Sequence, residues 1–587
     1  MPYLKHNLFS EKALYPLLLF IITVGTYYNA LIYVDFINLE DMDLMNRLLN
    51  ASSLNIKDLF LSINTINYYR PVIELSYRLD QLIWSGIPFG FHLTSIVLHT
   101  FNAYLVYILF LLLFDKVNRD NKIPAFVASS FFAVNPLLTE SIVWVSGRSD
   151  IIAANFMLLS LVCYLLHKRE VDDEYCRRGV RHFIYLAGSG FFYLLSAFTK
   201  EVALSIPIIV IMFEFLYMKH FRFKYNIRAS IAVSIYFICI TALYFMIFRG
   251  GGVDTSTANV TVSATGLSVS TPLDHIRTFL ASYGFYVKKL FLPNPLNFAI
   301  HRIDKSLYAI LGFIVSLVFL IWGLLRTNIF SFFAAWVLAT ISPAVIAAVL
   351  MLPWTPWAER YLYVPLIGFS IAAGYGFALF EERKRTVAIV LSAAILAFMW
   401  ASTQHRIYLW ADEERLWEDT ASKTDFGPVY YFYGRTLQEK GKEAQAVAQF
   451  EKAIPTGFSY FPYMALANIK LYKGDVEGFE EIFRRAMRDH PKKSELYRML
   501  AESYLQIAAN ENKNKDTYMS KAADSFEKYL DSTGENFMMH FRLSGIYRSL
   551  GRKKEAIPHL KKVIELAPPD SRYTGTARKL LADMGDN

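Results

Sequence analysis

The stretch His92–Phe114, HLTSIVLHTFNAYLVYILFLLLF, contains no Asp, Glu, Lys or Arg and is long enough to cross a bilayer as one helix. Similar apolar runs recur up to about Thr403, whereas after about Ala411 none exceeds a few residues. Because a span needs roughly 20 mostly apolar residues, the sequence predicts a membrane domain followed by a soluble domain.

The apolar runs predict about eleven membrane spans. The segment His275–Leu292 is apolar enough for a twelfth, but counting it would place the basic loops on both sides of the membrane, against the positive-inside rule. We therefore expect an interfacial or re-entrant helix there, and an uncleaved first span near the N-terminus. The eleven spans are expected to begin near Ala13, His92, Ile123, Asp150, Phe183, Ala203, Ala229, Leu307, Ile329, Tyr361 and Thr386.

The formal net charge is +9, but the basic residues gather in short loops between spans, such as Arg383–Arg385. This pattern favours membrane topology over nucleic-acid binding. It predicts a cytoplasmic N-terminus and places the C-terminal domain on the outer side. The three cysteines and the scattered histidines have no ligand spacing, so we expect no metal site and no disulfide framework.

Small residues recur in the soluble part at Gly434, Ala467 and Ala501, with a spacing close to the 34 residues of a tetratricopeptide repeat. A fourth unit follows at Ser544, and a capping helix is expected at the end. Stacked helix pairs of this kind leave a concave groove that suits an extended peptide, although a spacer or dimerisation role fits the same pattern. The predicted fold is all-α, with a transmembrane domain 1–410 that includes a first external loop 34–91, a linker 411–427 and about four repeats in 428–587.

Charged residues beside membrane spans are costly, so each needs a reason. Glu40 and Asp41 follow the first span directly, and such an acidic pair is a candidate general base. Tyr69-Arg70-Pro71 comes later in the same predicted external loop. An Arg there suits phosphate because its planar guanidinium makes paired, charge-assisted hydrogen bonds.

Three further groups of charged residues are predicted on the same outer face. Together they indicate a polar cavity for a phosphate and a sugar, although structural ion pairs are an equal alternative for Lys200 and Glu201. The Gly250–Gly252 run does not follow a strand, so no nucleotide cradle is expected. The members of the three groups are Glu140, Arg148 and Asp150; Lys200 and Glu201; and Glu359, Arg360 and Tyr361.

As an ordered set, these motifs resemble the transmembrane-and-tetratricopeptide-repeat (TMTC) family of protein O-mannosyltransferases and its prokaryotic relatives, which are GT-C glycosyltransferases. The resemblance covers nearly the whole chain. The number of repeats is small for a eukaryotic member, which favours a bacterial inner-membrane protein with periplasmic repeats; in a eukaryote the corresponding side is the lumen of the endoplasmic reticulum. The motifs that carry the resemblance are Glu40-Asp41, Tyr69-Arg70-Pro71, Asn135-Pro136 to Glu140, Trp144 to Asp150, Lys200-Glu201, Glu359 to Pro365 and Trp410 to Trp417.

The resemblance implies inverting transfer of a sugar from a polyprenyl phosphate to Ser or Thr hydroxyls of exported proteins, without a nucleotide or a required metal. Asp41 is expected to act as general base, with Glu40 orienting it or the acceptor. The repeats are expected to recruit the protein acceptor. The residues expected to bind the donor phosphate or sugar are Tyr69, Arg70, Glu140, Arg148, Asp150, Lys200, Glu201, Glu359, Arg360 and Tyr361.

Three other functions remain open on the sequence. A non-enzymatic scaffold with a peptide-binding repeat domain would tolerate neutralisation of Glu40, Asp41 and Arg70. A transferase acting on glycan or lipid acceptors would use the same membrane site. A transporter of lipid-linked sugar is disfavoured, because the charges gather at one face and not at mid-membrane depth.

Overall fold

The computed structural model describes residues 14–37, 40–50, 70–115, 117, 121–172, 180–247, 271–325, 327–510 and 514–585. Within these ranges the regular structure is helical, apart from a single β-bridge between Ile300 and Trp357. The chain forms two compact units, one of residues 1–446 with 456–458, and one of residues 447–455 with 459–587. The predicted all-α fold is confirmed.

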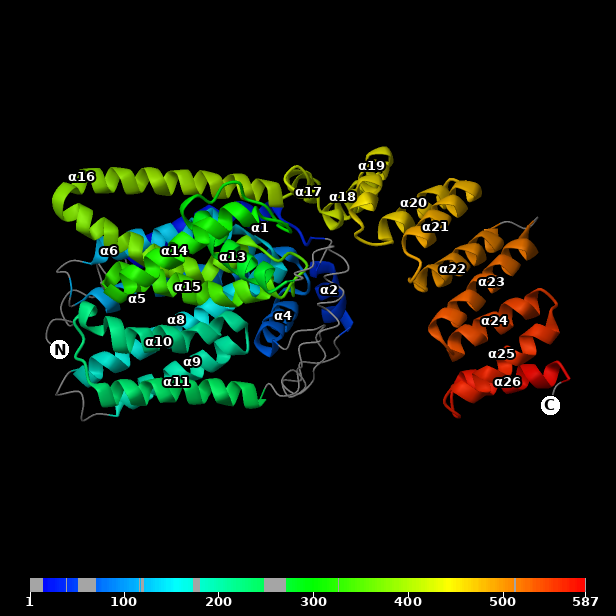
Figure 1. Ribbon diagram of the computed structural model, residues 1–587, viewed down its shortest axis with the longest axis horizontal. Coiled ribbons are helices and arrows are strands. Elements are labelled where there is room, and N and C mark those ends of the chain that lie inside the picture. The colour runs from blue at the N-terminus through cyan, green and yellow to red at the C-terminus, as the bar shows by residue number, and fades with distance from the viewer. Residues whose placement is uncertain are drawn as a thin grey trace. The chain divides into compact units, whose positions relative to one another are not determined.

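The first unit is a bundle in which the long helices run alongside one another (Figure 1). Short helices interrupt it, and three of them, η2, η4 and η8, carry five of the predicted site residues. The long and intermediate helices are α1 (Leu14–Tyr33), α2 (Glu40–Asn50), α4 (Pro71–Trp84), α5 (Pro88–Phe114), α6 (Lys122–Ala133), α7 (Thr139–Val143), α8 (Ser149–Asp172), α9 (Arg181–Ala197), α10 (Ile206–Met212), α11 (Ile227–Ile247), α13 (Pro272–Phe291), α14 (Lys305–Leu325), α15 (Ile329–Val349), α16 (Tyr363–Trp410), α17 (Glu413–Ala421) and α18 (Gly427–Glu439). The short ones are η1 (Pro136–Leu138), η2 (Val145–Arg148), η4 (Glu201–Ser205), η5 (Phe213–Tyr217, a π-helical turn), η6 (Met218–Phe221) and η8 (Glu359–Leu362).

Seven helices in the described ranges are long and apolar enough to cross a membrane, or eight if the bent pair Lys122–Ala133 and Pro136–Val143 is one span. The predicted count of about eleven is matched approximately. Two predicted spans, near Tyr361 and Thr386, are the two arms of α16, which bends at Lys384. The predicted spans near Phe183 and Leu307 correspond to α9, which has 17 residues, and to the shorter apolar stretch Lys305–Val318.

The helix α13 occupies the segment that was ambiguous in the sequence. It carries Asp274 in its first turn and Lys288 and Lys289 in its last turn, and it is not among the seven helices that qualify as spans. It packs along α14 and α15. Its interfacial or re-entrant placement stays a prediction.

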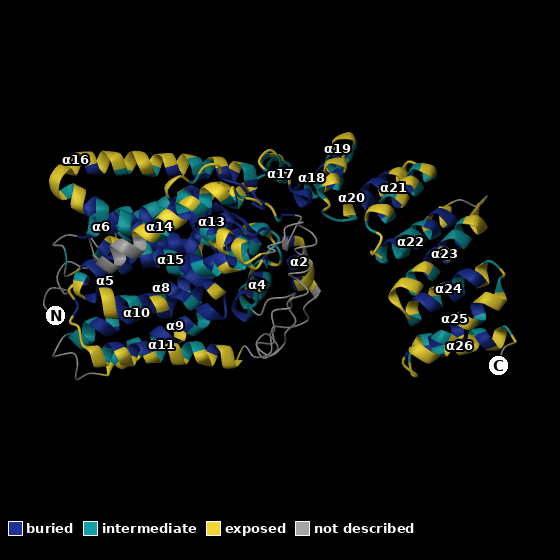
Figure 2. Cartoon of the chain, viewed as in Figure 1, coloured by how far each residue is buried: buried dark blue, intermediate teal, exposed yellow. Residues whose placement is uncertain are grey.

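Polar and small residues bring the membrane helices together where a hydrophobic driving force between helices is weak. Ser160 on α8 and Ser189 on α9 each donate a hydroxyl hydrogen bond of 2.8 Å to the other's backbone carbonyl. Gly284 on α13 faces Gly312 on α14 so closely that a Cβ at either position would lie 2.1 Å or 1.9 Å from a backbone oxygen of the partner helix. The outer faces of α11 and of the second arm of α16 expose apolar side chains (Figure 2), as lipid contact requires.

The second unit contains stacked helix pairs (Figure 1). The predicted small positions Ala467 and Ala501 are fully buried, and so are Phe526 and Leu560 at the predicted packing positions. The expected capping helix is α26, which buries Ala577 and Leu581 against the preceding helix. The helices are α19 (Glu443–Ala453), which crosses the unit boundary, α20 (Phe461–Tyr472), α21 (Val476–Asp489), α22 (Glu495–Asn510), α23 (Lys515–Thr533), α24 (Phe537–Ser549), α25 (Lys553–Leu566) and α26 (Arg572–Asp583).

We predict that Gly312→Ala destabilises the first unit, because its Cβ would overlap the carbonyl oxygen of Leu280 and force α13 and α14 apart. Overpacking of this kind costs about 1–3 kcal/mol. Unfolding of the purified chain in mixed micelles measures the loss. The matched control is Gly25→Ala on α1, where no heavy atom lies within 4 Å of the added Cβ. Equal stability of the two variants would contradict the close contact.

Candidate active site

The carboxylate of Asp41, in the first turn of α2, is held by donors on both oxygens. Oδ1 accepts hydrogen bonds from the hydroxyl of Ser146 and from its backbone N–H at 2.9 Å, while Oδ2 accepts from the backbone N–H of Ile37 at 3.2 Å. Asp41 is only 1% exposed. The contacts present the group as a hydrogen-bond acceptor in a fixed orientation, which is the form in which a carboxylate takes up a proton. The side chain of Glu40 and the whole of Tyr69 lie outside the described residues.

The segment Trp144–Asp150 connects Asp41 with most of the other predicted site residues. It is a 3-10 turn, η2, between α7 and α8. It packs against α7 so tightly that a Cβ on Gly147 would lie 2.9 Å from the carbonyl oxygen of Glu140. Every second residue of the segment contacts a different part of the site: Trp144 lies against Arg360, Ser146 binds Asp41, Arg148 pairs with Asp80 and Asp150 pairs with Lys200.

Arg148 is fully buried, and its guanidinium is surrounded by acceptors from the chain itself. It pairs with Asp80 at 2.5 Å, and it donates to the hydroxyl of Ser95 at 3.0 Å and to the carbonyl of Phe91 at 2.6 Å. These contacts fasten the Trp144–Asp150 segment to α4 and α5. The predicted role of Arg148 in binding the donor phosphate stays a prediction, and the observed contacts are those of a residue that positions the segment.

Arg70 and Arg360 lie close enough to Lys200 for their charges to shift its pKa. All three residues were predicted to bind the donor. Burial lowers the pKa of Lys200, Asp150 opposes this shift, and the neighbouring charges of Arg70 and Arg360 lower the pKa further. The ring of Tyr361 lies between Lys200 and Arg360, with its centre 5.3 Å from the Nζ of the former and 5.1 Å from the Cζ of the latter. Such mutual repulsion is relieved when an anion binds.

Each of these cations has a carboxylate partner. Lys200 binds Asp150 at 2.7 Å, and Arg360 pairs with Glu140, which is 1% exposed. One guanidinium nitrogen of Arg70 donates hydrogen bonds to both carboxylate oxygens of Glu201, at 2.7 and 3.0 Å. The side chains of the last pair are 23% and 49% exposed, so this pair is the most open to an incoming ligand.

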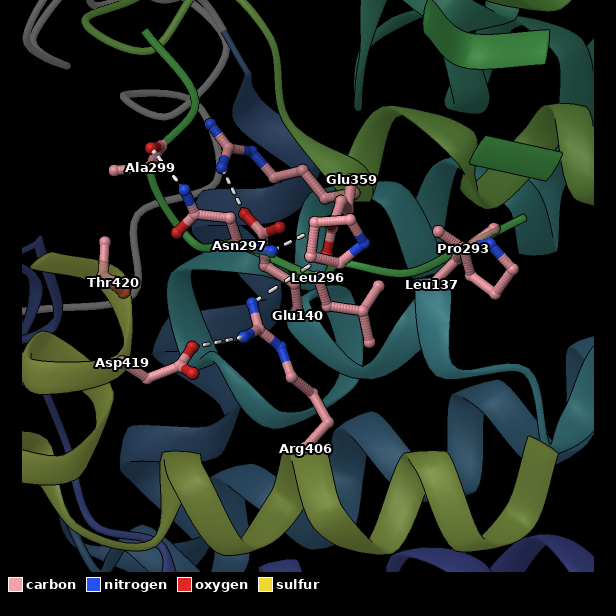
Figure 3. Close-up of polar contacts among 12 residues, drawn as sticks. Leu137, Glu140, Pro293, Leu296, Asn297, Ala299, Glu359, Arg406, Asp419 and Thr420 are labelled. Atoms are coloured by element: carbon pink, nitrogen blue, oxygen red, sulfur yellow. Dashed lines mark hydrogen bonds and ion pairs between the residues drawn. The ribbon is translucent and has the colours of Figure 1, made fainter. Parts of the chain in front are cut away.

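Glu359 belongs to a second group of buried charges. It directly precedes Arg360, which belongs to the first group. Its Oε1 accepts hydrogen bonds from Lys289 at 2.7 Å and from the backbone of Asn297 at 3.0 Å. Arg406 points from α16 toward Glu359 and toward Asp419 on α17 (Figure 3), at 3.9 and 3.6 Å respectively. Arg406 is 2% exposed, so its charge is balanced by these two carboxylates and not by solvent.

The predicted linker 411–427 is tied to the loop between α13 and α14 in the first unit. Lys423 donates to the carbonyl of Leu296 at 2.8 Å. His301 binds Asp425 through Nε2 at 3.1 Å and accepts from the hydroxyl of Thr424 at Nδ1, and its ring stacks on Phe426 at 4.6 Å. The start of the repeat region is therefore fixed to the loop that also supports Glu359.

Sequence reasoning did not identify four of the residues that build this site. Ser146 lies within a recognised motif, but no feature of the motif indicates that it binds Asp41. Asp80, Lys289 and Arg406 lie on apolar or amphipathic helices and are 2–3% exposed. The sequence feature that could have identified them is a charged residue within an apolar or amphipathic helix, because a buried charge requires a partner.

Comparisons with known proteins place the chain near one family. The Tetratricopeptide repeat family matches residues 427–454 and 539–570. The human protein O-mannosyl-transferase TMTC4 is 24% identical over 455 residues, which cover 66% of this chain and 58% of that protein. The Caenorhabditis elegans protein O-mannosyl-transferase F38B6.6 is 23% identical over 410 residues, covering 68% and 55%, and human TMTC2 is 35% identical over 99 residues, covering 17% and 11%. The chain thus resembles the TMTC family, as predicted, and spans less than two thirds of the length of these relatives.

We predict that Gly147→Ala loosens the site, because the new Cβ would meet the backbone of α7 and displace Ser146 and Asp150. The expected cost is about 1–3 kcal/mol in unfolding free energy. Hydrogen exchange of residues 40–48 and 144–150 should accelerate. Gly545→Ala on α24, where the added Cβ meets no atom within 4 Å, is the control. Unchanged exchange in both segments would contradict the role of Gly147.

The stability of the contacts around His301 should depend on pH. Burial lowers the pKa of His301 to about 4, with Asp425 opposing and Arg302 reinforcing the shift. The folded imidazole is therefore neutral, and its contribution to stability is complete above the unfolded value of about 6.5 and is lost as pH falls from there towards 4. Between pH 7.5 and pH 5 we expect the docking of residues 424–426, which follow α17, to weaken by roughly 1–2 kcal/mol.

Hydrogen exchange of residues 422–430 in the full chain measures this change. The His301→Gln variant should lose most of the pH dependence. His405→Gln, at an exposed position of α16, should retain it. The same pH dependence in wild type and His301→Gln would rule out His301 as its source.

Proposed function

We propose that this chain, as a relative of the TMTC protein O-mannosyl-transferases, is a membrane glycosyltransferase that moves a sugar from a polyprenyl phosphate to Ser or Thr hydroxyls of exported proteins. The observation that carries the proposal is the Trp144–Asp150 segment, which joins one fixed, acceptor-only carboxylate to a group of cations. A base for a hydroxyl and a counter-charge for a phosphate are the two requirements of this reaction.

The acceptor half of the reaction uses Asp41. A Ser or Thr hydroxyl is a weak nucleophile, so it gains from a carboxylate that removes its proton as the new bond to the anomeric carbon forms. Ser146 and Ile37 hold the Asp41 carboxylate in place, which reduces the reorganisation needed at the transition state. Attack from the face opposite the phosphate gives inversion at that carbon.

The donor half uses the cations. As the bond between the anomeric carbon and the phosphate oxygen breaks, its electron pair stays with the polyprenyl phosphate, which departs as an anion. The nearby charges of Arg70, Lys200 and Arg360 stabilise that anion. Arg70 is the member best placed to change partners, because its ion pair with Glu201 is the most exposed.

The carboxylates of the site are proposed to bind the sugar and to neutralise the cations around it. Each carboxylate forms an ion pair with one cation: Glu140 with Arg360, Asp150 with Lys200, and Glu359 with Lys289. The donor needs no nucleotide in this scheme, and no metal is assigned a step. The repeat unit is proposed to recruit the protein acceptor, with the chain in a bacterial inner membrane and the repeats on the periplasmic side.

We predict that Asp41→Asn removes transfer while preserving the fold, because an Asn Oδ1 still accepts from Ser146 but cannot take a proton. Loss of a general base typically reduces the rate by about 10²–10⁴-fold. Glycoproteomics of the cell envelope, with the gene deleted and then complemented, measures the effect. The control is Asp115→Asn, at an exposed position that pairs with Arg169.

The expected result is that a defined sugar on Ser or Thr disappears on deletion and returns with wild type and Asp115→Asn, but not with Asp41→Asn. Full restoration by Asp41→Asn would refute the assigned base. An unchanged protein glycome on deletion would redirect the acceptor to glycans or lipids. If glycolipids are also unchanged, the non-enzymatic scaffold replaces the transferase.

A further inference from the structure

An apolar groove lies between α6 and the two arms of α16, at the bend near Lys384. It has a volume of about 260 Å³. Val127 and Phe131 of α6, Phe377 of the first arm and Leu391 of the second arm are among its lining residues. The structure places α6 beside the bend of α16 (Figure 1).

The groove exists because the two arms of α16 pack unequally. On the first arm, Gly374 lies directly against α6, where an added Cβ would be 2.6 Å from the side chain of Ala128. The second arm is held near its far end, where Thr403 donates to the carbonyl of Val134 at 2.8 Å. Between these two contacts, second-arm residues from Ala388 to Leu396 line the groove.

An apolar groove in this position suits a hydrocarbon chain. Both arms belong to the apolar stretch Glu359–Trp410, which qualifies as membrane-spanning. An empty apolar gap forfeits dispersion contacts, and water does not occupy a site without polar partners. A lipid chain supplies the missing contacts without a polar cost.

The bend next to the groove carries one more basic than acidic residue. The bend that joins the arms has the sequence Glu381-Glu382-Arg383-Lys384-Arg385, and its charges must lie outside the hydrocarbon region. Glu381 pairs with Arg385 at 3.3 Å, which leaves two exposed cations, Arg383 and Lys384, against one carboxylate. Lys122 begins α6 one turn before Val127. This charge balance favours an anionic headgroup.

We propose that the groove and the basic bend together bind an anionic glycerophospholipid, with an acyl chain between α6 and α16 and the headgroup phosphate on Arg383 and Lys384. The site is separate from the cations assigned to the sugar donor. The first arm of α16, from Tyr363 to Lys384, spans roughly 30 Å, which is about the thickness of the hydrocarbon core of a bilayer, and Arg360 precedes this arm in η8. The two phosphate sites therefore lie at opposite membrane surfaces.

The test uses the full chain in nanodiscs with two photoreactive probes, phosphatidylglycerol and phosphatidylcholine, each carrying a diazirine on one acyl chain. Mass spectrometry maps the labelled peptides. We expect phosphatidylglycerol to label the groove segments of α6 and α16 at least ~10-fold more than phosphatidylcholine does. Arg383→Gln combined with Lys384→Gln should remove this preference, since each basic residue near a membrane surface contributes to anionic lipid binding.

A pair of single variants tests the groove itself. Ser392→Phe fills it and should abolish labelling of α6, whereas Val390→Phe, on the same arm but 63% exposed outside the groove, should not. If Ser392→Phe does not fold, the position of the label on the wild-type chain decides the question. Equal labelling by the two lipids, label spread over all spans, or displacement of the label by an equimolar polyprenyl phosphate would each overturn the proposal.

Discussion

The packing of Gly147 against α7 is the constraint on which the candidate site depends. Because position 147 has no Cβ, η2 lies directly on the backbone of Glu140 and Ser141. The polar residues on either side of it are then directed to different elements. Asp41 from α2, Asp80 from α4 and Lys200 from the turn after α9 each take their orientation from this one segment. Residues from distant parts of the chain meet here because a single turn supplies their partners.

Buried ion pairs of this kind do not by themselves stabilise a fold, because desolvation offsets the attraction. Replacing one partner is nevertheless strongly destabilising, because the unpaired buried charge lowers the free energy of unfolding by about 3–5 kcal/mol. The pairs Arg148–Asp80 and Lys289–Glu359 are of this type, with all four side chains 4% exposed or less. The Arg70–Glu201 pair differs from them, because its side chains are 23% and 49% exposed.

The sequence predicted the helical class, the change from membrane to repeat architecture and the gathering of charged motifs, because each depends on composition or on a short period. The structure brings Arg70 to Glu201, Lys200 to Asp150 and Arg360 to Glu140, all residues that had been singled out. Their pairing was not predictable, since Arg360 and Glu140 are 220 residues apart and no local pattern encodes such a contact.

The count of spans and the position of Arg148 show the limits of local reasoning. α9 falls short of a full span by length, and α16 is a single helical stretch that bends at Lys384, so the boundary of a span is decided by packing. Arg148 resembled a phosphate ligand by residue type. Its acceptors, on α4 and α5, became visible only in three dimensions.

We propose that one fixed carboxylate and a group of cations transfer a sugar from a lipid phosphate with inversion. The most direct measurement is a reaction of the purified full chain with a polyprenyl phosphate sugar of known anomeric configuration and a Ser/Thr-containing acceptor protein, followed by NMR of the product linkage. Polyprenyl phosphate should be released in step with transfer, and the product should have the opposite anomeric configuration. Retained configuration, or transfer only from a nucleotide sugar, would contradict it.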